Sequence, residues 1–386
     1  MKGFDMKSKR LFALLIVSAL VCSGCNQPGN HSESLVSEES ISAESMPSNS
    51  NSPGRTDFEI IVEDDTNPPV EGMVRSPLTN EWTNPETATT RPIAVMVPNE
   101  SAAIPHYNLS DASIIYEANV EGRLTRLMAI YENWEDMNKI GNIRSTRTYY
   151  AYWAFEWDAF LVHYGGPYYI NSLMDHELTQ NIDGLSGDNA AFYRTKDRPD
   201  PHNVYADGAA LRERIQTRKY ELSYRGITDE QHFQFAGKAN PNALTQYGDN
   251  AQNATYIDMS GCYPLTRCYF EYNEEDGLYY RSQHLSGGED APHTDADGEQ
   301  LAFKNILVQY TKQEVLDDKG YLVLQCHDNT RDGWFFTNGK GIHVTWEKGS
   351  DYGATRYYDD DGNEITLNTG KTMICIVNET DSFTFR

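Results

Sequence analysis

The stretch of residues 140–167 reads IGNIRSTRTYYAYWAFEWDAFLVHYGGP, and the rest of the fold is predicted outward from it. Its aromatic run over 148–156 predicts a helix, and the apolar run over 159–164 predicts a buried strand. Two glycines follow and indicate a turn, after which residues 168–176 are expected to form a second helix. The alternation of helix and strand indicates a mixed α/β region in this part of the chain.

Charged residues and glycines in this stretch predict an anion-binding site. Arg144 and Arg147 precede the aromatic helix, and His163 ends the strand just before Gly165 and Gly166. A guanidinium group binds phosphate or carboxylate through paired hydrogen bonds, and glycine lets backbone N–H groups approach an anion. The alternative is a structural role in which the two arginines pair with nearby carboxylates, namely those of Glu117, Glu121 or Glu156.

Upstream of this stretch, three apolar runs predict strands at 91–97, 113–118 and 124–131. Arg126 and the two acidic residues Glu117 and Glu121 lie close to the turn between the second and third runs. These side chains are therefore candidates for the same site.

Downstream, a proline-stiffened loop carries Arg194, His202 and Asn203. Histidine can act as acid, base or hydrogen-bond donor, and asparagine can orient a ligand, so these residues could complete the site. The alternative is that histidine and asparagine only satisfy the local backbone. Asp207 then predicts the N-cap of a helix over 208–219.

The remaining sequence indicates a β-rich second half and an α+β fold class. The N-terminal α/β domain is expected over 89–225, and residues 226–300 are expected to be an irregular connecting region with short strands. Residues 301–386 contain short apolar runs separated by hairpin signals such as Asn338-Gly339. They predict a mostly antiparallel, β-rich C-terminal domain, which packs with the preceding loop region as one domain or completes the sheet of the first domain.

The N-terminus predicts export and lipidation. Basic residues precede an apolar run at 11–21 that is too short to span a bilayer, so residues 1–25 are expected to be a signal peptide. Ser23-Gly24-Cys25 resembles the bacterial lipobox, which predicts that Cys25 is lipidated, for example with palmitate. Residues 26–88 are rich in Ser, Asn, Glu and Pro and are expected to form a disordered tether. The expected location is the extracytoplasmic face of the cell membrane.

The net charge of the chain argues against nucleic acid as a partner. The formal net charge is −25, from 57 acidic and 32 basic residues. Such a surface repels the phosphates of nucleic acid, so nucleic acid is not expected as a partner. Contact with the membrane is expected through the N-terminal lipid.

Four cysteines of the mature chain leave several pairings open. Cys262 and Cys268 flank a short loop and could be bridged, while Cys326 and Cys375 lie in separate strand-like runs and could pair across a sheet. Export permits disulfides, but sequence does not fix their connectivity. No Cys-x-x-Cys or adjacent Cys/His spacing is present, so no metal site is expected.

Several motifs resemble the YerB family of bacterial lipoproteins. The matching motifs include RPIAVMVPN, IIYEANVEGRLTRLMAIYE, IGNIRSTRTYY, HYGG and RPDPHNVY, and later FKNILVQYTKQEVLDDKG, WFFTNGKGIHVTWEKGS and TRYYDDDGNEITLNTGKT. The resemblance covers roughly residues 90–380. It implies a lipid-anchored envelope protein with an N-terminal and a C-terminal region, and it implies no particular activity.

A weaker likeness in the order of elements is to the LytR-CpsA-Psr envelope transferases. That likeness implies that Arg126 and Arg144 face the pyrophosphate of a polyprenyl-linked glycopolymer, with Mg²⁺ bound nearby. The acidic residue expected directly after the second arginine is Ser145 here. Metal binding and base catalysis would then need Glu117 or Glu121.

Two functions are therefore expected from the sequence. The first is binding of an anionic or glycan cell-envelope ligand, or of a partner protein, without a cofactor; its residues are Arg126, Arg144, Arg147, His163, Gly165, Gly166, Arg194, His202 and Asn203. The alternative is phosphotransfer from a polyprenyl-pyrophosphate-linked glycopolymer, with Mg²⁺ and with Glu117 or Glu121 as catalytic residues.

Overall fold

The computed structural model describes residues 65–229, 231–284 and 289–386. The expected signal peptide, its lipidation site Cys25 and residues 26–64 of the expected tether lie outside these ranges. In the described part of the chain, no helix combines the length and the apolar character needed to cross a membrane.

The C-terminal part of the expected tether, residues 65–88, is folded, which corrects the prediction. Strands β1 (Val74–Arg75) and β2 (Trp82–Thr83) pair antiparallel, and helix α1 (Pro85–Thr89) follows them. Leu78, between the two strands, is 1% exposed. The Ser76 hydroxyl donates to the Glu132 carboxylate at 2.7 Å. A few anchoring side chains hold this segment on the body of the fold, and a composition-based prediction of disorder does not detect them.

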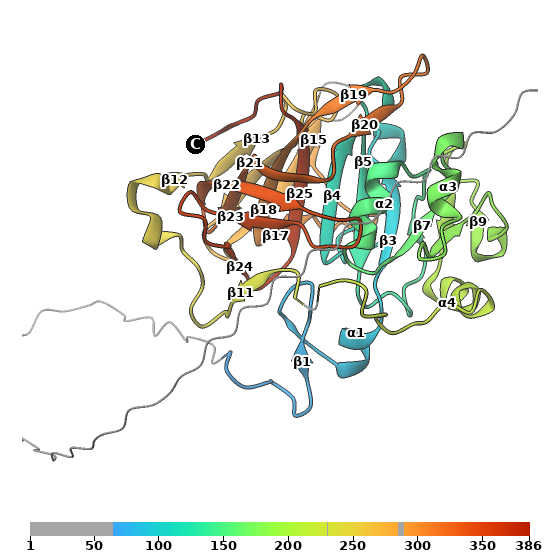
Figure 1. Ribbon diagram of the computed structural model, residues 1–386, viewed down its shortest axis with the longest axis horizontal. Coiled ribbons are helices and arrows are strands. Elements are labelled where there is room, and N and C mark those ends of the chain that lie inside the picture. Colours follow the sequence, from blue (N-terminus) through green and yellow to red (C-terminus); the bar gives the residue numbers. More distant parts are fainter. Residues whose placement is uncertain (1–64, 230, 285–288) are drawn as a thin grey trace, which may run out of the picture. The chain divides into compact units, whose positions relative to one another are not determined.

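Eleven strands of the described chain form a central mixed sheet (Figure 1). Its strand order is β12-β22-β21-β18-β25-β4-β5-β3-β7-β8, and β23 pairs with β22. The bounds in chain order are β3 (Ile93–Pro98), β4 (Ile114–Asn119), β5 (Thr125–Tyr131), β7 (Phe160–His163), β8 (Asn181–Asp183), β12 (Gln252–Asn253), β18 (Asn305–Thr311), β21 (Asp328–Thr337), β22 (Lys340–Lys348), β23 (Arg356–Tyr358) and β25 (Thr372–Asn378).

Both faces of the central sheet are covered, which explains why its inner strands are apolar throughout. In β3, Val95 and Val97 belong to one core cluster, whereas Ala94 and Met96 belong to the other. Alternate residues of a strand point to opposite faces of the sheet. Helix α2 (Thr148–Phe155) supplies aromatic side chains to the second cluster, including Trp153.

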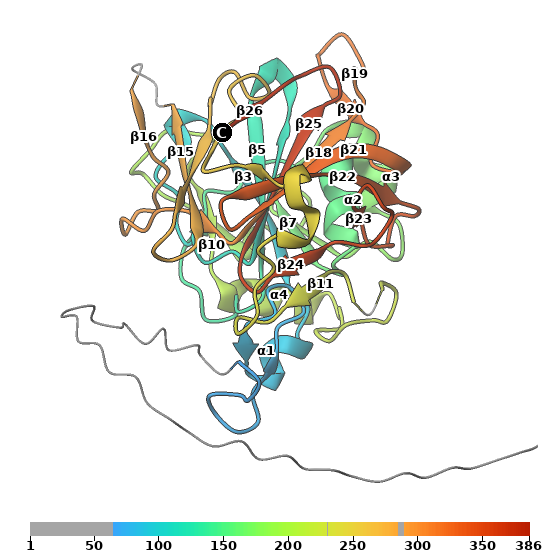
Figure 2. The same ribbon diagram turned by 90° about the vertical axis from the view of Figure 1, so that its left-hand side faces the viewer.

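A six-stranded sheet covers the other face of the central sheet, so that it and α2 lie on opposite sides (Figure 2). Its order is β16-β15-β14-β13-β26, with β17 paired to β15. The bounds are β13 (Tyr256–Asp258), β14 (Tyr269–Asn273), β15 (Leu278–His284), β16 (Asp290–Pro292), β17 (Ala302–Phe303) and β26 (Thr384–Phe385). Phe270 and Tyr279 of this sheet pack in the same cluster as Val95.

Smaller elements complete the described chain. A three-stranded sheet has the order β6 (Ile140–Gly141), β10 (Val204–Ala206) and β9 (Phe192–Arg194), and two further strand pairs are β11 (Gln234–Ala236) with β24 (Thr366–Asn368) and β19 (Gln313–Val315) with β20 (Leu322–Leu324). Helix α4 (Gly208–Thr217) begins after Asp207, whose carboxylate accepts from Ala210 N at 2.8 Å. The predicted N-cap is therefore present.

The α+β class is confirmed, and two regions differ from expectation. The helix expected over 168–176 is a 3-10 turn, η3 (Tyr168–Ile170), followed by the short α3 (Asn171–Met174). Residues 226–300 contribute most of the six-stranded sheet, so this region is more regular than expected. The C-terminal pairings are mostly antiparallel, but β25 runs parallel to both β18 and β4. The central sheet thus takes strands from both halves of the chain.

Candidate functional site

The candidate site lies at the edge where three parallel strands end. β3, β7 and β8 run in the same direction, and their last residues are Pro98, His163 and Asp183. Ligands of open sheets with parallel strands commonly bind outside the carboxyl ends of those strands. The backbone of Arg144 is fixed at this edge, because its N–H donates to Met96 O at 2.8 Å and its carbonyl accepts at 3.0 Å from the residue that follows β7.

Three arginines, Arg126, Arg144 and Arg147, form what we call the arginine cluster. Arg126 lies at the start of β5, opposite Pro98, and is 5% exposed. Its Nη1 donates to the carbonyl of Ser145 at 2.7 Å. Within the described chain, neither the buried Nε of Arg126 nor that of Arg144 has a hydrogen-bond partner. Two guanidinium donors are therefore available to an added acceptor.

The positive charge of the cluster is only partly balanced. Burial, together with the charges of Arg147 and Arg144, lowers the pKa of Arg126 to about 10, although Glu121 opposes this shift. Burial also lowers the pKa of Arg144, while Glu100 opposes the change. Mutual repulsion between buried cations is relieved when an anion binds between them.

Arg147 differs from the other two because it has a close carboxylate partner. Its Nε and Nη2 donate to the two oxygens of Glu121 at 2.5 and 2.7 Å. Burial acts against the shift, but the bond with Arg147 lowers the pKa of the Glu121 carboxyl. The structural pairing considered from sequence is thus found for Arg147, and it uses Glu121.

The helix that follows the cluster has an open N-terminus. Helix α2 begins at Thr148, directly after its N-cap residue Arg147, and in the described chain the N-cap side chain accepts no hydrogen bond from the first turn. The first N–H groups of a helix have no partners within the helix and carry a partial positive charge. This helix end therefore adds to the positive potential beside Arg147.

The downstream loop brings His202 near the cluster. His202 is 6% exposed, its Nε2 lies 3.5 Å from Glu100 Oε2, and its Nδ1 is buried without a partner among the described residues. Burial lowers its pKa; Glu100 opposes this shift, and Arg144 adds to it. His202, Glu100 and Arg144 therefore lie within electrostatic reach of one another.

Arg194 and Asn203 mainly stabilise their own loop. Arg194 forms an ion pair with Asp200 and donates to Asn203 Oδ1 at 2.6 Å. Its guanidinium carbon lies 4.9 Å from the ring centre of Tyr164. The Asn203 side chain also donates to the Thr195 carbonyl at 3.0 Å. These contacts do not support the predicted role of Arg194 and Asn203 in ligand binding.

The first amide of the glycine turn is used within the fold. Gly165 N donates to Asp183 Oδ1 at 2.7 Å, and its carbonyl accepts from Thr146 N at 3.0 Å. His163 Nδ1 lies 2.9 Å from the same carbonyl. A Cβ at Gly166 would come within 3.0 Å of Ile170. The Gly165 amide is thus engaged, and this turn fixes the loop that carries the arginines.

Glu117 lies in a different network from the arginine cluster. One of its oxygens accepts from Asn99 at 2.9 Å and from Thr125 at 2.7 Å, and the other accepts from Arg281 at 2.9 Å. Glu117 and Arg281 are both fully buried, so this ion pair joins β4 to β15. Of the two carboxylates considered for catalysis, Glu121 is the one at the cluster.

The four described cysteines are free thiols, so neither expected disulfide is formed. Cys262, Cys268, Cys326 and Cys375 are all buried. Burial raises the pKa of the Cys262 thiol to about 12. The cysteines pack in the two core clusters as small apolar side chains, a role that their spacing in the sequence does not reveal.

Two residues near the cluster were not predicted from sequence. Glu100 is the second residue after β3, and Arg198 donates to the carbonyls of Ala103 and Pro105, the latter at 2.9 Å. Glu100 lies outside the motifs that carry the family resemblance, whereas Arg198 is the first residue of the RPDPHNVY motif. That motif was the available signal for Arg198.

The fold and this edge define an α+β protein with a buried cationic site at the carboxyl ends of its parallel strands. Two family models match the chain: the N-terminal domain of "Protein of unknown function (DUF3048)" over residues 78–221 and its C-terminal domain over residues 260–374. The chain belongs to this family, which is also the YerB family.

A curated relative and a solved structure agree with this assignment. The chain is 26% identical over 323 residues to "Putative lipoprotein YerB" of Bacillus subtilis (strain 168), which covers 82% of this chain and 90% of the relative. It is also similar to the crystal structure of YerB from Bacillus subtilis, with a TM-score of 0.67 and 24% identity, covering 81% of this chain and 99% of the other. This structural likeness confirms the fold.

Proposed function

We propose that the protein is a lipoprotein anchored at the extracytoplasmic face of the cell membrane, and that it binds the anionic group of a cell-envelope ligand at the arginine cluster. The relative's name and the lipobox-like sequence before Cys25 support the anchor. The site itself supports the ligand class, because it offers guanidinium donors and, among the described residues, no carboxylate faces Arg126 or Arg144 as closely as Glu121 faces Arg147.

The observation that carries this proposal is the pair of unpartnered Nε atoms of Arg126 and Arg144. A buried donor without an acceptor costs roughly 1–3 kcal/mol, more when it is charged. Unpaired groups of this kind do not stabilise the fold. A bound phosphate or carboxylate would accept hydrogen bonds from the two Nε atoms. His202 beside Arg144 is suited to donate a further hydrogen bond to the same anion.

The test is the thermal unfolding midpoint of the full-length chain in a neutral detergent. It is measured with polyprenyl pyrophosphates, soluble wall fragments and polyanions, each with and without Mg²⁺. A ligand at about 100 times its dissociation constant stabilises the fold by roughly 2.7 kcal/mol, so the true ligand class raises the midpoint. If none of these anions raises it, the binding proposal fails and a protein partner becomes the working hypothesis.

The alternative function is phosphotransfer from a polyprenyl-pyrophosphate-linked glycopolymer. The position of Arg126 and Arg144 suits a pyrophosphate, but Glu117 is engaged with Arg281, so that Glu121 alone would have to help bind Mg²⁺ or act as the base. A rise in midpoint that requires Mg²⁺ and a polyprenyl pyrophosphate together would favour this alternative.

A further inference from the structure

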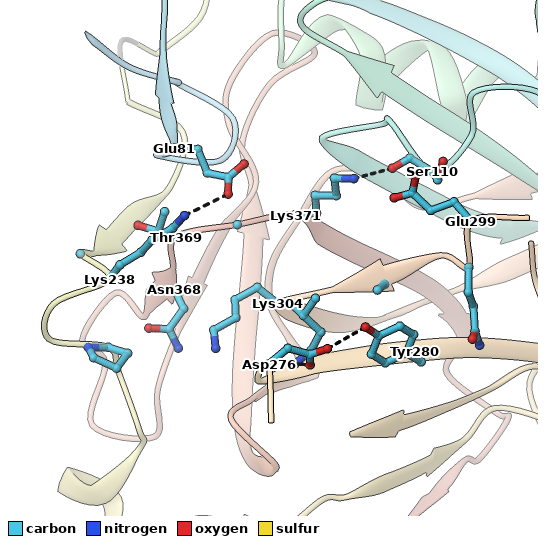
Figure 3. Close-up of a pocket in the computed structure, with 16 residues that line it drawn as sticks. Glu81, Ser110, Lys238, Asp276, Tyr280, Glu299, Lys304, Asn368, Thr369 and Lys371 are labelled. Carbon is cyan, nitrogen blue, oxygen red and sulfur yellow. Dashed lines mark hydrogen bonds and ion pairs between the residues drawn. The ribbon is translucent and has the colours of Figure 1, made fainter. Parts of the chain in front are cut away.

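A cavity of about 580 Å³ lies at the opposite edge of the central sheet from the arginine cluster (Figure 3). It adjoins the amino ends of β18 and β25, whereas the cluster lies beyond the carboxyl end of β3. Because β3, β4, β25 and β18 run in one direction, the two sites are separate. Ligand-binding cavities commonly measure about 300–1,000 Å³, so this volume suits a small molecule.

Charged side chains of both signs line this cavity. They come from distant parts of the sequence and comprise Glu81, Lys238, Asp276, Glu299, Lys304 and Lys371. Figure 3 shows Lys304 lying between Asn368 and Asp276, with Lys371 and Glu299 further along the same cavity. Three ammonium groups therefore face one space in a protein whose net charge is −25.

Two of the three lysines have only uncharged acceptors. Lys304 Nζ donates to the Gly277 carbonyl at 3.1 Å and to Asn338 Oδ1 at 2.8 Å. Lys371 Nζ donates to the Ser110 carbonyl at 2.5 Å. In the described ranges, the ion pair formed by a cavity lysine is that of Lys238 with Glu81, at 3.4 Å. Among the described residues, no carboxylate forms an ion pair with Lys304 or Lys371. Burial lowers the pKa of Lys304, and the nearby charge of Asp276 opposes this shift.

Two carboxylates of the cavity likewise form no ion pair in the described ranges, although Asp276 lies within electrostatic reach of Lys304. Asp276 Oδ2 accepts from the Tyr280 hydroxyl at 2.7 Å and from Asn273 at 3.0 Å, and both donors are neutral. Glu299 forms no ion pair within the described chain. The cavity therefore presents unbalanced charges of both signs, an arrangement that a ligand carrying both charges would satisfy.

The fold makes room for Lys304 at two backbone positions. Gly277 and Gly370 have φ angles of +70° and +138°, which L side chains rarely adopt. A Cβ at Gly277 would lie 2.7 Å from Lys304 Nζ, and a Cβ at Gly370 would lie 2.8 Å from Lys304 Cβ. Both glycines thus fix the path of this lysine, which ends at the cavity.

We infer that this cavity binds a small zwitterionic ligand, namely a short peptide with a free amino and a free carboxyl terminus. Its carboxylate would bind Lys371, and its ammonium group would bind Asp276 in the other part of the cavity. Gln300 also lines the cavity; its amide NH2 already donates to Arg281 O and Ser282 Oγ, and its side-chain carbonyl can accept from a peptide N–H between the two ends. This site goes beyond the anion binding proposed for the arginine cluster.

The experiment uses the full-length chain in neutral detergent and a pool of tripeptides with free termini. The same pool is prepared in N-acetylated and in C-amidated form, so that each terminal charge is removed separately. Binding is measured by calorimetric titration. We expect the free pool to bind and each capped pool to bind about tenfold more weakly, because each cap removes one charge pair.

Two variants assign the charges, and a third serves as the control. The Lys371→Met variant should bind the free pool about tenfold more weakly than the unchanged chain does. It should also bind the free and the amidated pools equally well. Asp276→Asn should no longer discriminate between the free and the acetylated pool. Lys312→Met, which removes an exposed lysine paired with Glu314 outside the cavity, should bind as the unchanged chain does.

Three results would overturn this inference. They are no binding of the free pool, equal binding of free and capped pools, or variants that bind and discriminate as the unchanged chain does. The thermal midpoint of each variant is recorded as well. If one variant does not fold, the other still decides between the outcomes, since the two act on opposite ends of the peptide.

Discussion

At the residue scale, the three guanidinium groups of the arginine cluster have different roles. Arg147 is held by both oxygens of Glu121, whereas Arg126 and Arg144 each keep a buried Nε without a partner in the described chain. The sequence predicted that arginines and carboxylates lie close together here, but it did not show which arginine pairs with which carboxylate. Glu121 lies in the turn and Glu117 lies on the strand before it, and the alternation of β4 determines that Glu117 points to the second sheet.

Arg144→Ala and Arg147→Ala are expected to differ in stability. Replacing Arg147 leaves the half-buried Glu121 without its partner and should lower the free energy of unfolding by about 1–2 kcal/mol. Replacing Arg144 removes a repelling cation and should change it by less than about 0.5 kcal/mol. Urea unfolding of both variants measures the difference. Equal losses would show that Arg144 also belongs to a structural ion pair.

At the element scale, the apolar runs located most strands but not their order. The runs at 113–118 and 124–131 became β4 and β5 because such runs bury on both faces of a sheet. That β25 would pair in parallel with β4 could not be predicted, because this pairing joins residues from opposite ends of the chain. The ion pair between Glu117 on β4 and Arg281 on β15 could not be predicted either, because these residues are also far apart in the sequence.

This buried ion pair predicts strong coupling between the two sheets. Arg281→Met leaves the Glu117 carboxylate buried without its cation and should lower the free energy of unfolding by about 3–5 kcal/mol. The double variant Glu117→Gln, Arg281→Met removes both charges and should regain most of that loss. Thermal unfolding of the single and double variants provides the measurement. A double variant no more stable than Arg281→Met would contradict the pairing.

At the scale of the whole molecule, buried histidines link folding to pH. His106 is fully buried; its Nε2 donates to Pro98 O at 2.8 Å, and its Nδ1 lies 3.1 Å from His293 Nε2. Burial lowers the pKa of His106 to about 4 from 6.5. Burial likewise lowers the pKa values of His202, His232 and His293. Each of these side chains favours the neutral form in the folded protein.

Acidification is therefore expected to destabilise the fold. Because the folded-state pKa of His106 lies below its unfolded value, the stability it contributes is present above pH 6.5 and is lost as pH falls toward 4. Asp295, whose pKa burial raises to about 6, acts in the opposite direction over part of this range. Between pH 7 and pH 5, His106 alone accounts for about 2 kcal/mol.

Urea unfolding at several pH values between 7 and 5 measures this dependence, and His106→Gln provides the comparison. The variant removes one titrating group, so its stability should fall less steeply with acid than that of the unchanged chain. A variant with the same slope would show that other groups cause the acid sensitivity.

The measurement that tests the account most directly is calorimetric titration of the full-length chain, in neutral detergent, with inorganic pyrophosphate. The unchanged chain should bind it, more weakly as salt is raised, because the contacts are ionic. Arg144→Ala should bind about tenfold more weakly or worse. Arg212→Ala, which removes a surface arginine paired with Glu135, should bind normally. Equal binding by all three chains, or no binding by the unchanged chain, would contradict the assignment of an anion site to the arginine cluster.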